Sequence, residues 1–380
     1  MKIIRSTKCS TKFTTSTKQA QLAAVLNEYA KTVNFFINHF WSTKTPSKAE
    51  LLKPVVDLPE TWLSARLRKV AAREAIDMIQ ASKKRMPDAP VKPEHKGKRM
   101  CVSSTIANLR EPKAAEGFDR WLELRCLGDK VKIDIPIQLH RHFNRLAAKG
   151  RMQASYIITK SDVQFSFEIE TGPKRSGHQA IGLDAGIACL ATLSDGTQFG
   201  TKTKERLERI QRCQHGSKGQ TRARRALRQS MDEHARNIVN CGADAIVVEN
   251  LTGISTGTKL KRRLSQNIRR FVGNWNWKYF IGRLQQQCES NRVVFRTVSP
   301  RNTSITCSMC GHTDKGNRRS QSVFRCLGCG CQGNADHNAA RNIVDRFLSG
   351  PYGAGYKPAN LVNLGMHFQN VTPNLTPRFS

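Results

Sequence analysis

Two pairs of cysteines near the C-terminal end of the sequence have the spacing of a metal site. Each pair encloses two residues, and fifteen residues separate the pairs: Cys307 and Cys310, then Cys326 and Cys329. Four thiolates presented by two such turns form the closed, tetrahedral ligand set of a structural zinc ion. The sequence therefore predicts one structural Zn²⁺, with Cys331 and His312 close enough in sequence to be alternative ligands. Two disulfides are the other interpretation, which a reducing compartment disfavours.

Three acidic residues stand where a carboxylate needs a partner. Asp184 ends an apolar stretch that begins at Ile181, Glu249 ends one that begins at Ala245, and Asp336 starts a predicted helix. A charge at the edge of a buried strand is costly unless it is paired or binds a cation. Singly, these acids could be a turn residue, a strand-end charge and a helix N-terminal acid. Together they predict a site for two Mg²⁺ ions about 4 Å apart, which could hydrolyse a phosphodiester.

The charge of the whole chain indicates what such a site would act on. The sequence has 380 residues, with 63 Lys and Arg against 29 Asp and Glu, a formal net charge of +34. A hydrophobic content of 38% permits a buried core and excludes wholesale disorder. A compact protein this cationic repels itself unless a polyanion neutralises it, and nucleic acid is the usual polyanion. A surface charged only for solubility is the weaker interpretation.

Basic residues gather in two runs between the predicted acids. Ten of the residues from 201 to 230 are Lys or Arg, and a second run follows near residue 260. A charge run is often only a solvated face, but in this chain phosphate contact is the better interpretation. The predicted nucleic-acid-binding residues are Arg222, Arg224, Arg225, Arg228, Lys259, Lys261, Arg262 and Arg263.

The first half of the chain predicts strands around a helical insert. Residues 3–15 are rich in β-branched types, and helices are expected from residue 16 and after Pro59. Alternating apolar residues then predict hairpins around Gly128-Asp129 and around Lys160-Ser161-Asp162. These elements indicate a small antiparallel barrel that carries a helical insert.

The second half changes pattern. Strands are expected at residues 181–184 and 187–193, then a helical stretch at 202–240 that breaks near Gly216, then a buried strand at 243–249. A helix at 274–288 and a strand at 292–298 follow. Strands first in a meander and then alternating with helices predict a mixed sheet of the ribonuclease-H type. The fold class is therefore α+β with several domains, and residues 350–380 are expected to form a flexible tail.

These motifs, in this order, resemble the transposon-associated TnpB nucleases. The resemblance is carried by Gly-Leu-Asp184-Ala-Gly, Val-Val-Glu249-Asn-Leu, the four-cysteine cluster and Asp336-His-Asn-Ala-Ala-Arg-Asn-Ile343. It implies that Asp184, Glu249 and Asp336 are the metal-binding catalytic acids of a RuvC-type nuclease. Asn250 departs from the Asp found in many relatives, and the segment before Cys307 lacks the usual aromatic residue. Neither departure removes a ligand.

The resemblance also implies a domain plan. It comprises a wedge-like β-barrel at residues 1–15 and 100–175, a helical recognition lobe at 16–99, a RuvC-like nuclease at 176–300 and 333–349, and a zinc ribbon that binds target nucleic acid at 301–332. The implied partners are a guide RNA and a double-stranded target DNA that carries a short adjacent motif. The protein would read the shape of the heteroduplex while base pairing reads its sequence.

Further expectations concern the surroundings of the protein. A secretory or membrane segment is not expected, since the first residues lack an apolar region and the longest apolar stretches are short. The expected location is the cytoplasm of a prokaryotic cell, in association with the nucleoid, and a monomer is favoured. Three other functions compete with the guided nuclease: a guided repressor that binds without cutting, a transposase that joins strands, and a guide-free nuclease.

Overall fold

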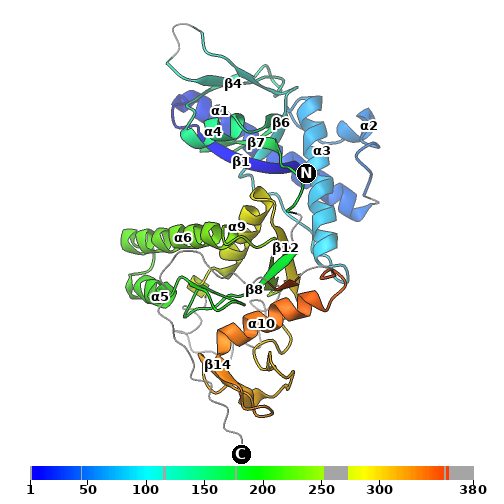
Figure 1. Ribbon diagram of the computed structural model, residues 1–380. Helices are drawn as coiled ribbons and strands as arrows, with labels where there is room; N and C mark the ends of the chain where they lie inside the picture. The colour runs from blue at the N-terminus through cyan, green and yellow to red at the C-terminus, as the bar shows by residue number, and fades with distance from the viewer. Residues whose placement is uncertain are drawn as a thin grey trace, which may run out of the picture. The chain divides into compact units, whose positions relative to one another are not determined.

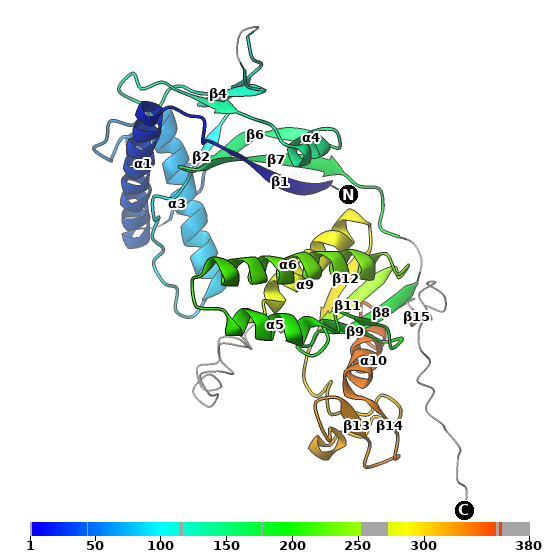
Figure 2. The same ribbon diagram turned by 90° about the vertical axis from the view of Figure 1, so that its left-hand side faces the viewer.

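The computed structural model describes residues 2–43, 45–113, 117–175, 178–251, 273–354 and 357–358. The chain divides into two units, Lys2–Glu170 and the part that begins at Thr171, and each is taken separately below (Figures 1 and 2). Among the helices described, none is both long enough and apolar enough to cross a membrane. The second basic run, with Lys259, Lys261, Arg262 and Arg263, lies outside the described residues, as does most of the tail.

The described residues of the first unit form two antiparallel sheets. The larger has the order β1 (Lys2–Ser10), β7 (Asp162–Glu170), β6 (Arg151–Ile158) and β2 (Met100–Ser103). The smaller has the order β3 (Ala107–Arg110), β4 (Arg120–Leu124) and β5 (Ile133–Ile137). The predicted strands are thus present, but the pairing among the described strands does not close them into the predicted barrel. Alternation in the sequence shows that one face of a strand is buried and leaves open which edges pair.

Helices α1 (Ser16–Ser42) and α3 (Ala65–Arg85) run side by side in this unit and confirm the predicted helical insert (Figure 2). The apolar residues expected on one face of α1, from Leu22 to Phe36, are buried in one core with residues of both sheets. The Tyr29 hydroxyl donates a hydrogen bond of 2.7 Å to the buried carboxylate of Glu74 on α3. The short helices α2 (Lys53–Val56) and α4 (Arg141–Ala147) complete the unit.

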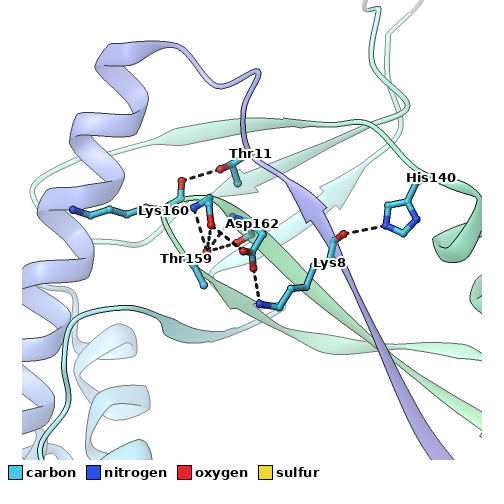
Figure 3. A network of polar contacts seen from close by, with 7 residues as sticks. Lys8, Thr11, His140, Thr159, Lys160 and Asp162 are labelled. Carbon is cyan, nitrogen blue, oxygen red and sulfur yellow. Dashed lines mark hydrogen bonds and ion pairs between the residues drawn. The ribbon is translucent and has the colours of Figure 1, made fainter. Parts of the chain in front are cut away.

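The turn between β6 and β7 confirms the second predicted hairpin and also fixes β1 (Figure 3). Thr159 closes the turn, since its hydroxyl accepts from the Asp162 amide at 3.0 Å. The Lys8 ammonium lies 3.3 Å from the Asp162 carboxylate, and the Thr11 hydroxyl donates to the Lys160 carbonyl at 2.9 Å. A ring nitrogen of His140 lies 3.0 Å from the Lys8 carbonyl. Side-chain contacts therefore tie the first strand to a hairpin that lies far away in the sequence.

The second unit is built on the predicted mixed sheet. Its strands lie in the order β10 (Gln198–Phe199), β9 (Ala191–Leu193), β8 (Gln179–Asp184), β11 (Ala245–Glu249) and β12 (Val294–Val298), and β15 (Lys357–Pro358) also pairs with β8. The first three in sequence form an antiparallel meander, whereas β11 is parallel to both β8 and β12. Parallel neighbours end at the same edge of a sheet, so β8 and β11 deliver their last residues to one place.

Helices cover both faces of this sheet. Helices α5 (Thr203–Arg212), α6 (Lys218–Val239) and α9 (Trp277–Ser290) share a core with the residues of β8 and β11 that point to one side. Helix α10 (Ala335–Leu348) shares a second core with the residues that point to the other side. Between β12 and α10 lies the cysteine-containing segment, with the single 3₁₀ turn η2 (Lys315–Asn317) and the two short strands β13 (Val323–Arg325) and β14 (Gln332–Asn334).

Close contact at Gly182 sets the distance between α10 and the sheet. A Cβ at this position would lie 2.1 Å from the Ala340 carbonyl oxygen and 2.8 Å from the Val344 amide nitrogen. Both neighbours are backbone atoms, so they cannot move without moving the helix. We expect Gly182→Ala to lower the free energy of unfolding by about 1–3 kcal/mol through overpacking. Thermal or urea unfolding of the purified chain measures this loss.

Gly282 supplies the matched control for this substitution. It lies within α9, and apart from the backbone of its own helix a Cβ there would meet no atom of the described residues within 4 Å. Gly282→Ala should therefore be neutral or stabilise the chain by up to about 1 kcal/mol, because alanine is the better helix former. Equal stability of Gly182→Ala and the unaltered chain would contradict the close packing of α10 on β8.

Candidate active site and zinc site

The three predicted acids meet at one edge of the mixed sheet. Leu183 of β8 is aligned with Val248 of β11, so the next residues, Asp184 and Glu249, end neighbouring parallel strands at the same level. Asp336 stands in the first turn of α10, where the Asn334 side chain caps the helix and accepts from the Asp336 amide at 2.9 Å. The structure thus brings acids separated by 65 and 87 residues in sequence to one place.

The pKa values of the acids show that their charges interact. The pKa of Asp184 is raised to about 7, chiefly by burial and then by the nearby carboxylates of Glu249 and Asp336, while Arg318 opposes the shift. Burial also raises the pKa of Glu249 and that of Asp336. A shift in this direction means that the chain itself supplies too little positive charge to stabilise three ionised carboxylates.

Two polar side chains that the sequence did not single out contact these acids. The Arg318 guanidinium lies 3.2 Å from Asp336 Oδ1, and its charge opposes the rise in pKa of all three acids. The hydroxyl of Thr303 donates a hydrogen bond to Glu249 Oε1. In a chain with 63 basic residues, one arginine carries no local signal of its role. Thr303 could have been noticed only as a member of the Thr-Ser pair before Cys307.

The donor set suits a hard divalent cation. Mg²⁺ prefers carboxylate oxygens together with water and substrate phosphate, and these three side chains offer carboxylate oxygens with too little positive charge around them. Among the described residues, only the cysteines form a group whose ligand atoms all lie within 4.8 Å of one another, so the acids are spaced more widely.

The four predicted cysteines form one compact cluster. The sulfur atoms of Cys307 and Cys329 lie 3.7 Å apart, those of Cys310 and Cys326 lie 3.6 Å apart, and all four fall within 4.8 Å of one another. Four sulfurs held tetrahedrally at about 2.3 Å from zinc would be about 3.8 Å apart, close to the two distances above, so the cluster could bind one Zn²⁺. Cys331 and His312, the alternative ligands, are not members of this group.

Backbone conformation explains how each cysteine pair folds. Gly311 and Gly330 follow the two pairs directly and have φ angles of +76° and +70°, which side chains other than glycine rarely adopt. Their amides donate to the carbonyls of Cys307 at 2.9 Å and Cys326 at 3.1 Å. Each turn therefore closes on itself and directs two sulfur atoms to the same side.

The first basic run forms an exposed cationic face on α6. Arg222, Arg224, Arg225 and Arg228 are all exposed on this helix, while Leu227 and Met231 point into the core. The Arg228 guanidinium lies 5.5 Å from the ring centre of Tyr279, and Arg224 donates to the Asn274 side chain at 3.1 Å. Both contacts hold the arginines against α9 and its preceding turn, and the guanidinium groups remain accessible to an anion.

Comparison with known proteins finds a family model and several relatives that match this chain. The family model described as the Cas12f1-like TNB domain matches residues 277–343, which include the cysteine cluster, Arg318 and Asp336. A putative RNA-guided DNA endonuclease of Escherichia coli strain K12, InsQ, is 32% identical over 48% of this chain and 52% of its own length. The CRISPR-associated endodeoxyribonuclease Cas12f1 of Sulfoacidibacillus thermotolerans is 37% identical over 21% of this chain and 20% of its own length.

Solved structures share the fold of this chain. A Cas12f1 complex with guide RNA and target DNA aligns over 87% of this chain and 83% of its own, with a TM-score of 0.51 and 15% identity. The mini RNA-guided endonuclease Cas-phi3 aligns over 94% of this chain and 93% of its own, with a TM-score of 0.54 and 10% identity. These likenesses show a shared mixed α+β fold. The sequence matches, which span about half of InsQ and a fifth of Cas12f1, confirm the resemblance to RNA-guided nucleases of the TnpB and Cas12f type.

Proposed function

We propose that this relative of the TnpB and Cas12f nucleases is an RNA-guided DNA endonuclease with one RuvC-type active site. The observation that carries the proposal is the convergence of Asp184, Glu249 and Asp336 at one sheet edge, where burial and the neighbouring carboxylates raise the pKa of Asp184. The strand order also supports it, since a three-stranded meander followed by two parallel strands agrees with the predicted ribonuclease-H-type sheet.

The chain's own residues would share the work of phosphodiester hydrolysis. Asp184, Glu249 and Asp336 would hold two Mg²⁺ ions, which when bound supply Lewis-acid stabilisation and lower the pKa of water. Arg318, now paired with Asp336, would offer its guanidinium to the phosphate oxygens that gain charge in the transition state. The burial of Asp184 and Asp336 would limit the entry of bulk water and so strengthen these interactions.

The remaining parts would bind the nucleic acids. We assign the ribbon at residues 301–332 to the target DNA and the arginines of α6 to phosphate contacts. Residues 16–99 would be the recognition lobe, and the strands of residues 1–15 and 100–175 the wedge-like domain. Guide RNA and target DNA are taken as partners because a Cas12f1 of the same fold has been solved in a complex with both and because the chain carries a net charge of +34.

Copurification tests this function directly. The chain is expressed together with RNA from the flanking region of its own gene, and the RNA that copurifies is sequenced. The protein with its bound RNA is then incubated with Mg²⁺ and with plasmids that carry a matching target next to a library of adjacent sequences. We expect cleavage only of matching plasmids with one short adjacent motif.

The other outcomes separate the competing functions. Guided binding without any cut would indicate a repressor, and joining of transposon ends would indicate a transposase. Cutting that persists after all RNA has been removed would indicate a guide-free nuclease. Each of these results would overturn the proposal of a guided endonuclease.

A further inference from the structure

Thr303 is placed to control the Glu249 carboxylate. The residue lies between β12 and the first cysteine pair and is only 2% exposed. Its hydroxyl has one proton and two acceptors within reach, Glu249 Oε1 and the Pro300 carbonyl oxygen at 3.0 Å. A carboxylate is the stronger acceptor, and hydrogen bonds to charged groups are roughly twice as strong as neutral ones. The Thr303 hydroxyl therefore donates its hydrogen bond to Glu249.

Helix α10 fixes the segment that carries Thr303. The Asn342 side-chain amide donates to the Thr303 carbonyl at 2.8 Å and to the Thr306 carbonyl at 2.7 Å. One turn earlier, the Asn338 amide donates to the same Thr306 carbonyl at 2.8 Å. Both asparagines are 8% exposed, so these hydrogen bonds are shielded from competing water.

The same helix links this segment to the third acid and to the cysteine cluster. Asn338 accepts a hydrogen bond of 2.9 Å from the amide of Ser308, which lies inside the first cysteine pair. Asp336 stands only two residues before Asn338 on α10. Helix α10 therefore carries Asp336, contacts the first cysteine turn, and holds in place the segment whose Thr303 contacts Glu249.

Folding alone does not account for the Thr303 hydroxyl. Asn342 holds the segment through backbone carbonyls, and these bonds would form with any side chain at position 303. The hydroxyl could also be satisfied locally by the Pro300 carbonyl, without an acid. Its contact with Glu249 orients one carboxylate oxygen, which leaves the other oxygen for a different partner.

We propose that Thr303 is a positioning residue that orients Glu249 for divalent metal, and that Asn338 and Asn342 hold it in register with Asp336. The inference rests on the proposed function, in which Glu249 is a metal ligand. Residues that orient metal ligands from behind contribute about 10- to 100-fold to metal affinity or activity. The cysteine ribbon is thereby part of the acid site through hydrogen bonds, in addition to any contact with nucleic acid.

Three threonine substitutions in the full chain test this role. Thr303→Val keeps the shape and removes the hydroxyl, Thr303→Ser keeps the hydroxyl, and Thr306→Val is the matched control in the same segment. The Thr306 hydroxyl donates to the Asn302 carbonyl at 2.8 Å and lies 2.9 Å from the Thr313 hydroxyl. Each variant is measured twice: for Mn²⁺ binding by calorimetry, and for the Mg²⁺ concentration that gives half-maximal cleavage of a matching target.

We expect Thr303→Val to weaken Mn²⁺ binding and raise the half-maximal Mg²⁺ concentration by about 10- to 100-fold. Thr303→Ser and Thr306→Val should both stay close to the unaltered chain. Unchanged metal dependence in Thr303→Val would overturn the inference, as would an equal loss in Thr303→Ser, which would assign the effect to packing.

Two further measurements keep the inference testable if a variant or the nuclease fails. Should Thr303→Val not fold, as judged by thermal unfolding, Asn342→Leu must show the same direction of change in Mn²⁺ binding, and its failure to do so would overturn the inference. If the unaltered chain binds Mn²⁺ but never cuts DNA, the proposed function is wrong. The effect of Thr303 on Mn²⁺ binding is then still decided by the calorimetric comparison.

Discussion

Asp184→Asn should abolish guided cleavage and make the metal-free chain more stable. The lost carboxylate removes a ligand for both proposed ions, and several kcal/mol of transition-state stabilisation correspond to a rate loss of about a thousandfold or more. The gain in stability follows from the pKa of Asp184, which is raised to about 7 by burial and by its acidic neighbours. Cleavage rates in Mg²⁺ measure the first effect, and thermal unfolding at pH 8 without divalent metal measures the second.

The sign of the stability change follows from proton linkage. Between the ordinary pKa of 3.8 and the folded value near 7, the folded state holds a proton that the unfolded state has released. The stability of the metal-free chain therefore falls as pH rises through this window, and the loss of stability is complete above the folded pKa of Asp184. The side-chain amide in Asp184→Asn is uncharged at every pH, so this loss of stability does not occur in the variant. A variant that melts lower than the unaltered chain at pH 8 would contradict the proposed cost of burying this carboxylate beside two other acids.

Asp195→Asn is a matched control for this substitution. Asp195 lies in the turn between β9 and β10 and accepts from the amide and the hydroxyl of Thr197, each at 2.9 Å. It is an aspartate of the same unit, but its carboxylate is engaged in a local turn. Its replacement should alter the free energy of unfolding by only about 1 kcal/mol, the effect of one lost hydrogen bond. The chain then stays folded and keeps all three proposed acids, so the cleavage rate should stay within about tenfold of the unaltered chain.

Cys326→Ser should release zinc and, with it, most of the cleavage activity. The segment between β12 and α10 has a small core of Cys307, Phe324, Cys326 and Ala335, which cannot fold it without a metal. Arg318 and Thr303, which contact the acids, belong to this segment or lie at its start. Loss of zinc therefore removes both contacts, and we expect cleavage to fall by about 100-fold or more.

Cys331→Ser is the matched control, because it lies in the same segment outside the four-cysteine group. Elemental analysis should find one zinc per chain in the unaltered protein and in Cys331→Ser, and substantially less in Cys326→Ser. Full zinc content with unimpaired cleavage in Cys326→Ser would exclude its sulfur as a ligand. Loss of zinc from Cys331→Ser would place the fifth cysteine in the set instead.

The sequence could single out the acids and the cysteines as candidates because each carries a local signal. Asp184 and Glu249 follow runs of residues that are buried on both sides of the sheet, so a charge at the end of the run is conspicuous. The two C-x₂-C pairs have a spacing that few other structures require. The mixed sheet was predictable for the same reason, since buried strands alternate with helices in that half of the chain.

The side-chain contacts to the acids and the strand pairing in the first unit could not be predicted from the sequence. Arg318, Thr303 and Asn342 make side-chain contacts to residues that are distant in the sequence, and only the folded chain brings these together. The strands of the first unit were recognised by alternation, but β3, β4 and β5 form their own sheet where a single barrel was expected. Alternation reports which face is buried, whereas pairing depends on long-range contacts.

Anomalous diffraction from crystals soaked in Mn²⁺ tests most directly whether the three acids form one metal site. The account predicts peaks within coordination distance of Asp184, Glu249 and Asp336 in the unaltered chain, and their loss in Asp184→Asn. Manganese bound elsewhere while these three carboxylates remain without a peak, at a concentration that supports cleavage, would contradict it.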